Sequence, residues 1–196
     1  MGTRVVGLAG RPGCGKSTVA KALSGRPNVE AIDLDRMAWE AYEPETPTYE
    51  RLVGRFGVGI LSDDGRIDRQ RLATIAFSDA ATKRDLDAIV HPAVSALLEE
   101  LVVTARARGV EILFVEGALL ASSPHVDRSV FDAILWLEAS DETRRDRLRA
   151  DGREAQAGRM DGAEPGAQAI VIDAEGAGSE VAERVWQSIE RQSASR

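Results

Sequence analysis

The sequence predicts an α/β domain built on a parallel sheet, because strand-like runs alternate with helical patterns. The strand-like runs are residues 5–9, 112–115, 133–137 and 169–172, with a weaker one at 30–33. The runs at 5–9, 112–115 and 133–137 are continuously apolar, as expected of strands buried on both faces. Helical patterns begin near residues 16, 36, 49, 69, 92, 141 and 179. This alternation indicates a doubly wound fold whose ligands bind outside the carboxyl ends of the strands.

Size and composition narrow the class of protein. The chain has 196 residues, 43% of them hydrophobic and 29% charged, which is typical of one globular domain. Its formal net charge of −7 disfavours a nucleic-acid partner. No apolar run approaches the roughly 18 residues of a membrane span, and the single Cys14 cannot form an internal disulfide. We therefore expect a cytoplasmic protein without a membrane partner, and the oligomeric state is left open.

Residues 10–18 carry the strongest motif. They match the phosphate-binding pattern G-x-x-x-x-G-K-[ST] at every fixed position, between the strand at 5–9 and a helical stretch. Glycines let backbone N–H groups surround a polyphosphate, Lys16 can reach the β- and γ-phosphates, and Ser17 can ligate Mg²⁺. The alternative is a glycine turn that only joins strand to helix. The predicted ATP-binding residues are Gly10, Gly13, Cys14, Gly15, Lys16, Ser17 and Thr18, with Cys14 at a free position of the loop.

Three acids are candidates for metal binding and proton transfer. Asp33 and Asp35 end the second strand, and alternation predicts both carboxylates on one side of it. One could accept a proton from a hydroxyl while the other supports the water shell of a metal ion. The alternative is that either one caps the helix near residue 36. Glu116 follows the third strand where an Mg²⁺-binding acid would lie, although it could equally be a strand-terminal acid in a turn.

Two segments outside the predicted sheet have possible roles. Residues 36–109 contain several helical patterns and no convincing strand, so this insertion is the candidate substrate-side subdomain. Residues 151–167 have no clear period and are expected to form a mobile loop, with disorder as the alternative. An arginine cluster precedes and enters this loop: Arg144, Arg145, Arg147, Arg149, Arg153 and Arg159. These arginines could meet a transferred phosphoryl group, or half or more could belong to a solvated helix face.

A longer block of sequence resembles one kinase family. The block comprises Phe56-Gly57, Ile60-Leu61, Asp64-Gly65-Arg66-Ile67-Asp68-Arg69, Leu72, Phe77, Leu86, Ile89 and His91-Pro92. Together with the phosphate loop, the I-D-x-D acids and Glu116-Gly117, it is similar to dephospho-CoA kinases over nearly the whole chain. The resemblance implies a P-loop NTPase-type five-stranded parallel sheet flanked by helices, with a helical CoA-binding insertion (36–109) and a short lid (151–167).

The same resemblance implies an activity and a set of roles. The activity is transfer of the γ-phosphoryl group of ATP, with Mg²⁺, to the ribose 3′-hydroxyl of dephospho-CoA. Asp35 resembles the general base and Arg147 the phosphate-contacting arginine at the base of the lid. Arg69 and His91 lie in the acceptor-side block, and Ser17, Asp33 and Glu116 form the predicted metal group.

This chain departs from the family pattern at several positions. Ala9, Arg11 and Ala118 stand where the family usually has Thr, Gly and Pro, and the lid is several residues shorter. These differences leave two alternatives open: a related kinase for another hydroxyl or nucleotide acceptor, and a nucleotide- or CoA-binding protein that has lost catalysis. The intact Lys16, Ser17 and Asp35 together argue against loss of catalysis.

Overall fold

The computed structural model describes residues 2–117, 120, 128–157 and 163–194. The chain divides into two compact units. The sheet unit comprises Met1–Asp33 and Val102–Arg196, and the helical unit comprises Leu34–Leu101. Each unit is described separately below. The expected single domain, with an acceptor-binding insertion at 36–109 and a lid at 151–167, stays a prediction.

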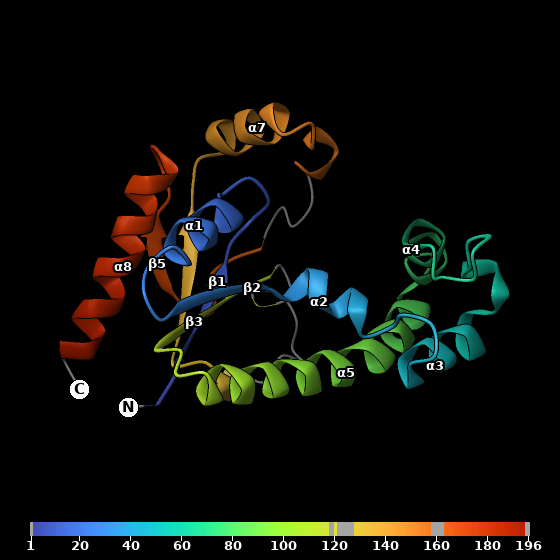
Figure 1. Cartoon of the computed structure of the whole chain (residues 1–196). Coiled ribbons are helices and arrows are strands. Elements are labelled where there is room, and N and C mark those ends of the chain that lie inside the picture. The colour runs from blue at the N-terminus through green and yellow to red at the C-terminus, as the bar shows by residue number, and fades with distance from the viewer. Residues whose placement is uncertain (1, 118–119, 121–127, 158–162, 195–196) are drawn as a thin grey trace. The chain divides into compact units, whose positions relative to one another are not determined.

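The sheet unit contains the predicted five-stranded parallel sheet (Figure 1). Its strands are β1 (Arg4–Ala9), β2 (Val29–Asp33), β3 (Ile112–Glu116), β4 (Ala133–Glu138) and β5 (Ile170–Asp173), in the spatial order β2-β3-β1-β4-β5. Every pair of neighbours is parallel. Its described helices include α1 (Lys16–Leu23), α7 (Asp141–Ala150) and α8 (Gly178–Ala194), with short 3-10 turns at Arg128–Val130 and Glu154–Gln156. The carboxyl ends of the strands therefore share one edge, as the sequence predicts.

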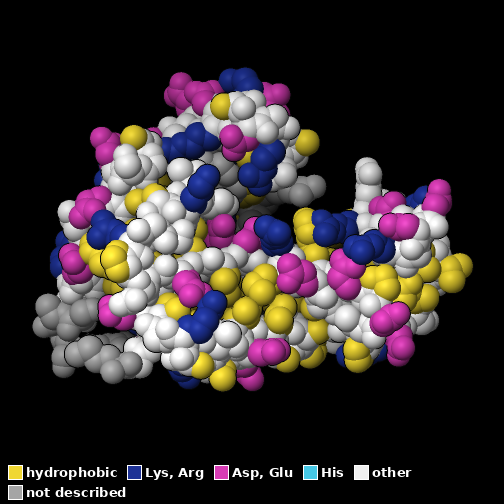
Figure 2. Space-filling model, in the orientation of Figure 1, with side chains coloured by type: hydrophobic (Ala, Val, Ile, Leu, Met, Phe, Trp, Pro, Cys, Tyr) yellow, Lys and Arg dark blue, Asp and Glu magenta, His cyan; other side chains and the backbone are white. Residues whose placement is uncertain are grey.

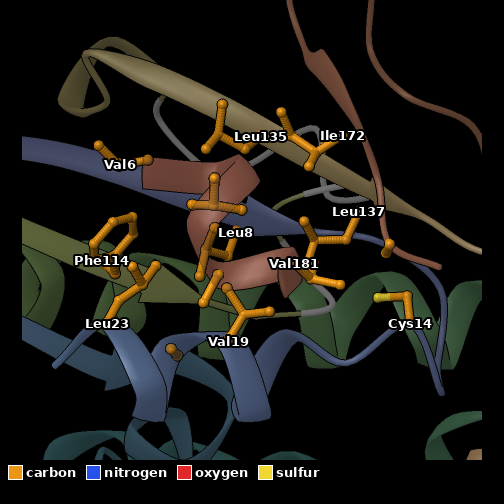
Figure 3. Packing of buried hydrophobic residues seen from close by; sticks show 14 of the residues in the cluster. Val6, Leu8, Cys14, Val19, Leu23, Phe114, Leu135, Leu137, Ile172 and Val181 are labelled. Atoms are coloured by element: carbon orange, nitrogen blue, oxygen red, sulfur yellow. The ribbon is translucent and has the colours of Figure 1, made fainter. Parts of the chain in front are cut away.

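In the core of the sheet unit, α1 and α8 pack against the sheet (Figure 3). Leu8 of β1 is fully buried, as are Phe114 of β3 and Leu135 of β4. Val19 and Leu23 of α1 pack in the same cluster, at the spacing of four that places two side chains on one helix face. Each such side chain contributes about 1.5–3 kcal/mol when it is removed from water. The free position of the phosphate loop, Cys14, is also buried in this cluster, so this side chain anchors the loop.

The helical unit has its own core. Its helices are α2 (Leu34–Glu40), α3 (Pro47–Phe56), α4 (Arg69–Ala76) and the first part of α5 (Ala80–Ala107), with a 3-10 turn at Val58–Ile60. The Thr46 side chain caps α3, and the Asp68 carboxylate caps α4 by accepting from two backbone N–H groups. The buried cluster consists of Leu52, Ile60, Leu72, Ala76 and Ile89. No strand is assigned between β2 and β3, a stretch that is described throughout, which agrees with the sequence analysis.

Two local predictions were wrong. The strand β2 ends at Asp33 and Asp35 lies in the first turn of α2, so strand alternation does not place the two carboxylates on one side. The chain turns into the helix at Leu34, whose side chain is fully buried. The helix start near residue 92 was also wrong, because α5 runs unbroken from Ala80 to Ala107 with Pro92 inside it. Proline costs this helix one backbone donor without ending it.

By length and composition, α5 could cross a membrane, with a mean hydropathy of 1.5 over its most apolar 18 residues. A third of that window is buried within the protein. The buried side chains include Ile89 in the helical-unit core and Val94, Leu98 and Val102 further along. A core helix of a soluble protein passes the same test, so this observation is weak evidence for a membrane segment.

Candidate active site

The phosphate loop, residues 10–18, joins β1 to α1 at the carboxyl edge of the sheet, and its glycines are required by its path. Gly10 and Gly13 have positive φ values of 143° and 82°. A Cβ atom at Gly13 would lie 2.5 Å from the carbonyl oxygen of Arg144, and one at Gly10 would lie 2.6 Å from that of Leu137. Both contacts are too short for any side chain. The loop therefore approaches the backbone of β4 and α7 as closely as the chain can.

Lys16 lies at the start of α1, with its side chain folded over the loop. Its Nζ donates to the carbonyl oxygen of Gly10 at 2.8 Å and reaches that of Arg11 at 3.4 Å. The N-cap residue of α1 is Gly15, which makes no side-chain cap hydrogen bond. The first N–H groups of the helix and the Lys16 ammonium thus form a cationic, donor-rich surface suited to a polyphosphate.

The three residues of the predicted metal group converge at this edge. Ser17 Oγ donates to Glu116 Oε2 at 2.8 Å. Glu116 ends β3 and is only 8% exposed, and Asp33 at the end of β2 is its register partner. Hydroxyl and carboxylate oxygens are ligands that Mg²⁺ prefers, usually together with substrate phosphates rather than in an all-protein cage. The described residues contain no group of three His, Cys, Asp or Glu that could hold a metal ion.

Arg147 of α7 connects the loop to the segment after β5. Its Nη2 donates to the carbonyl oxygens of Ala174 at 3.0 Å and Gly176 at 2.8 Å, and its Nη1 reaches that of Cys14 at 3.3 Å. The structure thus brings Arg147 to the phosphate loop. All three acceptors are backbone carbonyls, and a contact between Arg147 and a phosphate stays a proposal.

A second arginine of α7, Arg144, belongs to the predicted arginine cluster, but the sequence did not distinguish it from the other members. Arg144 is 2% exposed, and its Nε donates to the carbonyl oxygen of Pro12 at 2.9 Å. Its Nη1 pairs with Asp141 Oδ1 at 2.7 Å. The spacing of α7 alone gave no signal for this role, because the acceptor on Pro12 is distant in sequence.

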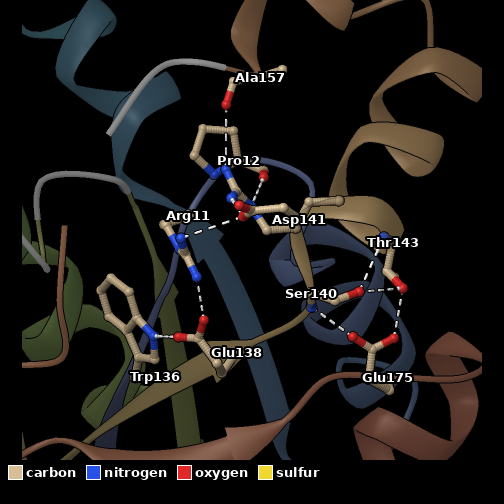
Figure 4. Close-up of polar contacts among 10 residues, drawn as sticks. Arg11, Pro12, Trp136, Glu138, Ser140, Asp141, Thr143, Ala157 and Glu175 are labelled. Atoms are coloured by element: carbon tan, nitrogen blue, oxygen red, sulfur yellow. Dashed lines mark hydrogen bonds and ion pairs between the residues drawn. The ribbon is translucent and has the colours of Figure 1, made fainter. Parts of the chain in front are cut away.

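Arg11 extends the same network. Its guanidinium pairs with Glu138 at the end of β4, which also accepts from the indole N–H of Trp136. Arg11 lies 3.5 Å from Asp141 Oδ1 as well. The unusual arginine of the loop is therefore neutralised by two acids at the β4–α7 junction (Figure 4). A strand-terminal acid in the sequence, Glu138, was the signal that could have indicated this pairing.

Glu175 connects the segment after β5 to the start of α7. It accepts from the backbone N–H of Ser140 and the hydroxyl of Thr143, each at 2.6 Å. These hydrogen bonds, with a smaller contribution from the positive charge of Arg147, lower the pKa of Glu175. Two links, Arg147 and Glu175, thus join α7 to this segment.

Other arginines of α7 form ordinary surface pairs. Arg149 is 64% exposed and pairs with Asp146 and Glu154, at 2.9 and 2.8 Å. Over α7, at the top of the view in Figure 2, basic and acidic side chains are interspersed. This agrees with the expectation that part of the cluster belongs to a solvated helix face. The predicted lid arginine Arg159 and the family departure Ala118 lie outside the described residues.

The acceptor-side candidates all belong to the helical unit. Asp35 lies in the first turn of α2. Arg69 is the first residue of α4, is exposed and stacks on the ring of Trp39. His91 is buried within α5, with its Nε2 3.9 Å from Asp87 Oδ1. Their roles toward an acceptor stay predictions.

Comparison with known proteins gives one consistent result. The sequence pattern of the dephospho-CoA kinase family matches residues 4–160. A dephospho-CoA kinase of Geobacter sulfurreducens is 34% identical over 187 residues, covering 92% of this chain and 94% of the relative. The crystal structure of TT1252 from Thermus thermophilus has a TM-score of 0.79 and 28% identity, with 98% of each chain covered.

A dephospho-CoA kinase of Campylobacter jejuni shares the fold, with a TM-score of 0.56 and 18% identity over 96% of this chain and 97% of that one. The relatives indicate an ATP-dependent phosphotransferase. With a match over most of its length to the family pattern, this chain belongs to the dephospho-CoA kinase family.

Proposed function

We propose that this enzyme transfers the γ-phosphoryl group of ATP to the 3′-hydroxyl of dephospho-CoA and uses Mg²⁺ as cofactor. The hydrogen bond between Ser17 and Glu116 is the observation that carries the proposal. It joins the loop hydroxyl to a strand-terminal carboxylate beside Lys16, the combination that holds a metal–nucleotide complex in P-loop enzymes. Membership of the family supplies the choice of acceptor.

The sheet unit supplies the nucleotide side of the reaction. Backbone N–H groups of the phosphate loop and the Lys16 ammonium bind the β- and γ-phosphates. Ser17 would hold Mg²⁺, with Asp33 and Glu116 supporting it, and the ion would supply positive charge against the transferred group. Arg147 serves at the base of the lid, where we propose that it also meets a phosphate.

The helical unit supplies the acceptor side. The 3′-oxygen of dephospho-CoA forms a bond to the γ-phosphorus as the bond from that phosphorus to the ADP oxygen breaks. Asp35 accepts the proton of the 3′-hydroxyl, and Arg69 and His91 contribute to the surface that binds the acceptor. Contacts with the remote pantetheine arm position the hydroxyl, which raises kcat as well as lowering KM. We also propose a cytoplasmic location, with neither nucleic acid nor membrane as a partner.

The test compares three acceptors in one assay. ADP release is measured with dephospho-CoA, adenosine and AMP, and mass spectrometry locates the new phosphate. We expect kcat/KM to be far higher for dephospho-CoA, with the phosphate on the 3′-oxygen. Equal kcat/KM values for the three acceptors, or a phosphate at another position, would refute dephospho-CoA as the acceptor. The assignment of the protein as a kinase would still stand. Nucleotide binding without any ADP release would refute the proposed catalytic activity.

A further inference from the structure

We propose that Trp39 is a positioning residue that holds Arg69 ready to bind the phosphates of the acceptor. The inference rests on the proposed function and adds a specificity-determining residue to it. The guanidinium carbon of Arg69 lies 3.0 Å from the centroid of the Trp39 ring. Trp39 belongs to α2 and Arg69 begins α4, so the stack joins two helices of the same unit.

The charge of Arg69 is not neutralised by another side chain of the described residues. Its neighbours in sequence are paired: Arg66 with Glu43 at 2.9 Å, and Arg71 with Asp68 at 3.3 Å. Among the residues that the structure describes, the Arg69 guanidinium has neither a hydrogen-bond acceptor nor an ion-pair partner. Its donors therefore remain available to a ligand.

Tyr42 adds no competing charge. Burial raises the pKa of Tyr42 to about 12, although the nearby positive charge of Arg69 acts in the opposite direction. The phenol thus stays protonated and neutral throughout the range in which enzymes work. Arg69 keeps its full positive charge for an anion.

A second tryptophan–arginine stack shows what a purely structural pair looks like here. Arg26 lies over the ring of Trp186 with its guanidinium carbon 4.1 Å from the centroid. Arg26 also pairs with Glu183 at 2.7 Å, so its charge is already satisfied within the sheet unit. The stack in the helical unit is tighter and lacks such an acid, and Trp39 remains 38% exposed.

Stacking explains how Trp39 would favour phosphate binding. A guanidinium lying flat on an indole keeps its N–H donors around its edge, in the plane where they can form paired bonds to phosphate oxygens. It also restricts a flexible side chain before the ligand arrives, which reduces the entropy lost on binding. Dephospho-CoA carries a pyrophosphate, the chemistry that such an arginine fits. ATP carries the same chemistry, so the experiment must separate the two substrates.

The main variant is Trp39→Leu, which keeps an apolar side chain but removes the ring. We expect it to raise KM for dephospho-CoA by about three- to ten-fold, with kcat within about two-fold and KM for ATP unchanged. Trp39→Phe, which retains an aromatic face, should recover most of this loss. Trp186→Leu is the matched control at the other stack and should leave both KM values unchanged.

Two further variants test the route through Arg69. Arg69→Lys keeps the charge but removes the planar guanidinium, so it should also raise KM for dephospho-CoA. It tests the proposal if Trp39→Leu fails to fold. In an Arg69→Ala background, Trp39→Leu should cause no additional change, because the two residues act as a unit.

Several outcomes would overturn the inference. These are an unchanged KM for dephospho-CoA in folded Trp39→Leu, additive losses with Arg69→Ala, and an effect on ATP instead. The wild-type enzyme in the same assay distinguishes a wrong role for Trp39 from a wrong proposed function. If it phosphorylates dephospho-CoA while Trp39→Leu behaves identically, only the role of Trp39 is refuted.

Discussion

Replacing Arg144 by Met should destabilise the protein far more than the same replacement at Arg149. Both residues lie on α7, both form ion pairs, and Arg and Met have similar helix propensities. They differ in burial, since the side chain of Arg144 is 3% exposed and that of Arg149 is 64% exposed. The comparison therefore isolates the effect of burial on arginine contacts.

The expected magnitude follows from what each replacement leaves behind. Without Arg144, the carbonyl oxygen of Pro12 loses a donor at 2.9 Å, and a charge-assisted bond of this kind is worth about 1.5–3 kcal/mol. Asp141 is 60% exposed, so water can solvate it and its ion pair contributes at most about 1 kcal/mol. We expect the free energy of unfolding to fall by about 1.5–4 kcal/mol for Arg144→Met. Arg149→Met should lower it much less, because water solvates both of its ion pairs and weakens them.

Urea denaturation monitored by tryptophan fluorescence suits this test, because Trp136 is buried in the sheet unit and reports its unfolding. Arg144→Met should also raise KM for ATP, since Arg144 holds the phosphate loop through Pro12. Arg149→Met, with two ion pairs of its own, is the control. An equal or larger loss for Arg149→Met would refute the reasoning from burial.

Three further predictions concern single side chains. Lys16→Ala should lower kcat by orders of magnitude with little change in melting temperature, because we propose that its Nζ binds the phosphates. Asp35→Asn should lower kcat by about 10²–10⁴-fold, the usual contribution of a general base, and Asp33→Asn should cost less. Tyr42 has a pKa of about 12 in the folded protein against 10.0 for the free group, so its contribution to stability is complete below pH 10 and lost between pH 10 and 12. Tyr42→Phe should remove that pH dependence.

Each of these predictions has its own control and contradicting result. Far-UV dichroism accompanies the kinetics of Lys16→Ala, and retention of most turnover would remove the phosphate-loop assignment. A larger loss for Asp33→Asn than for Asp35→Asn would mean that the two roles are exchanged. For Tyr42, stability is measured by denaturation from pH 8 to 12, and identical curves for both proteins would contradict the buried, neutral phenol.

The sequence determined the parts of this protein that depend on local chemistry. Continuous apolar runs predicted the buried parallel strands, since a strand covered on both faces has no polar side. The glycines and Lys16 predicted the phosphate loop, because few other residue types can follow that backbone path and bind phosphate. The sequence also predicted that Asp33 and Glu116 end strands, and these strands, β2 and β3, lie side by side.

Only the tertiary structure decided which charged side chains are buried and which partners they contact. Arg144 and Arg149 look alike in the sequence of α7, but one is buried against the carbonyl of Pro12, 132 residues away, and the other is exposed. The pairing of Trp39 with Arg69 likewise joins residues from separate helices. The helical conformation of Asp35 in α2 and the unbroken helix α5 depend on tertiary packing. This packing outweighs local signals such as strand alternation and Pro92. Burial and long-range contacts are properties of the folded chain, and local sequence patterns do not specify them.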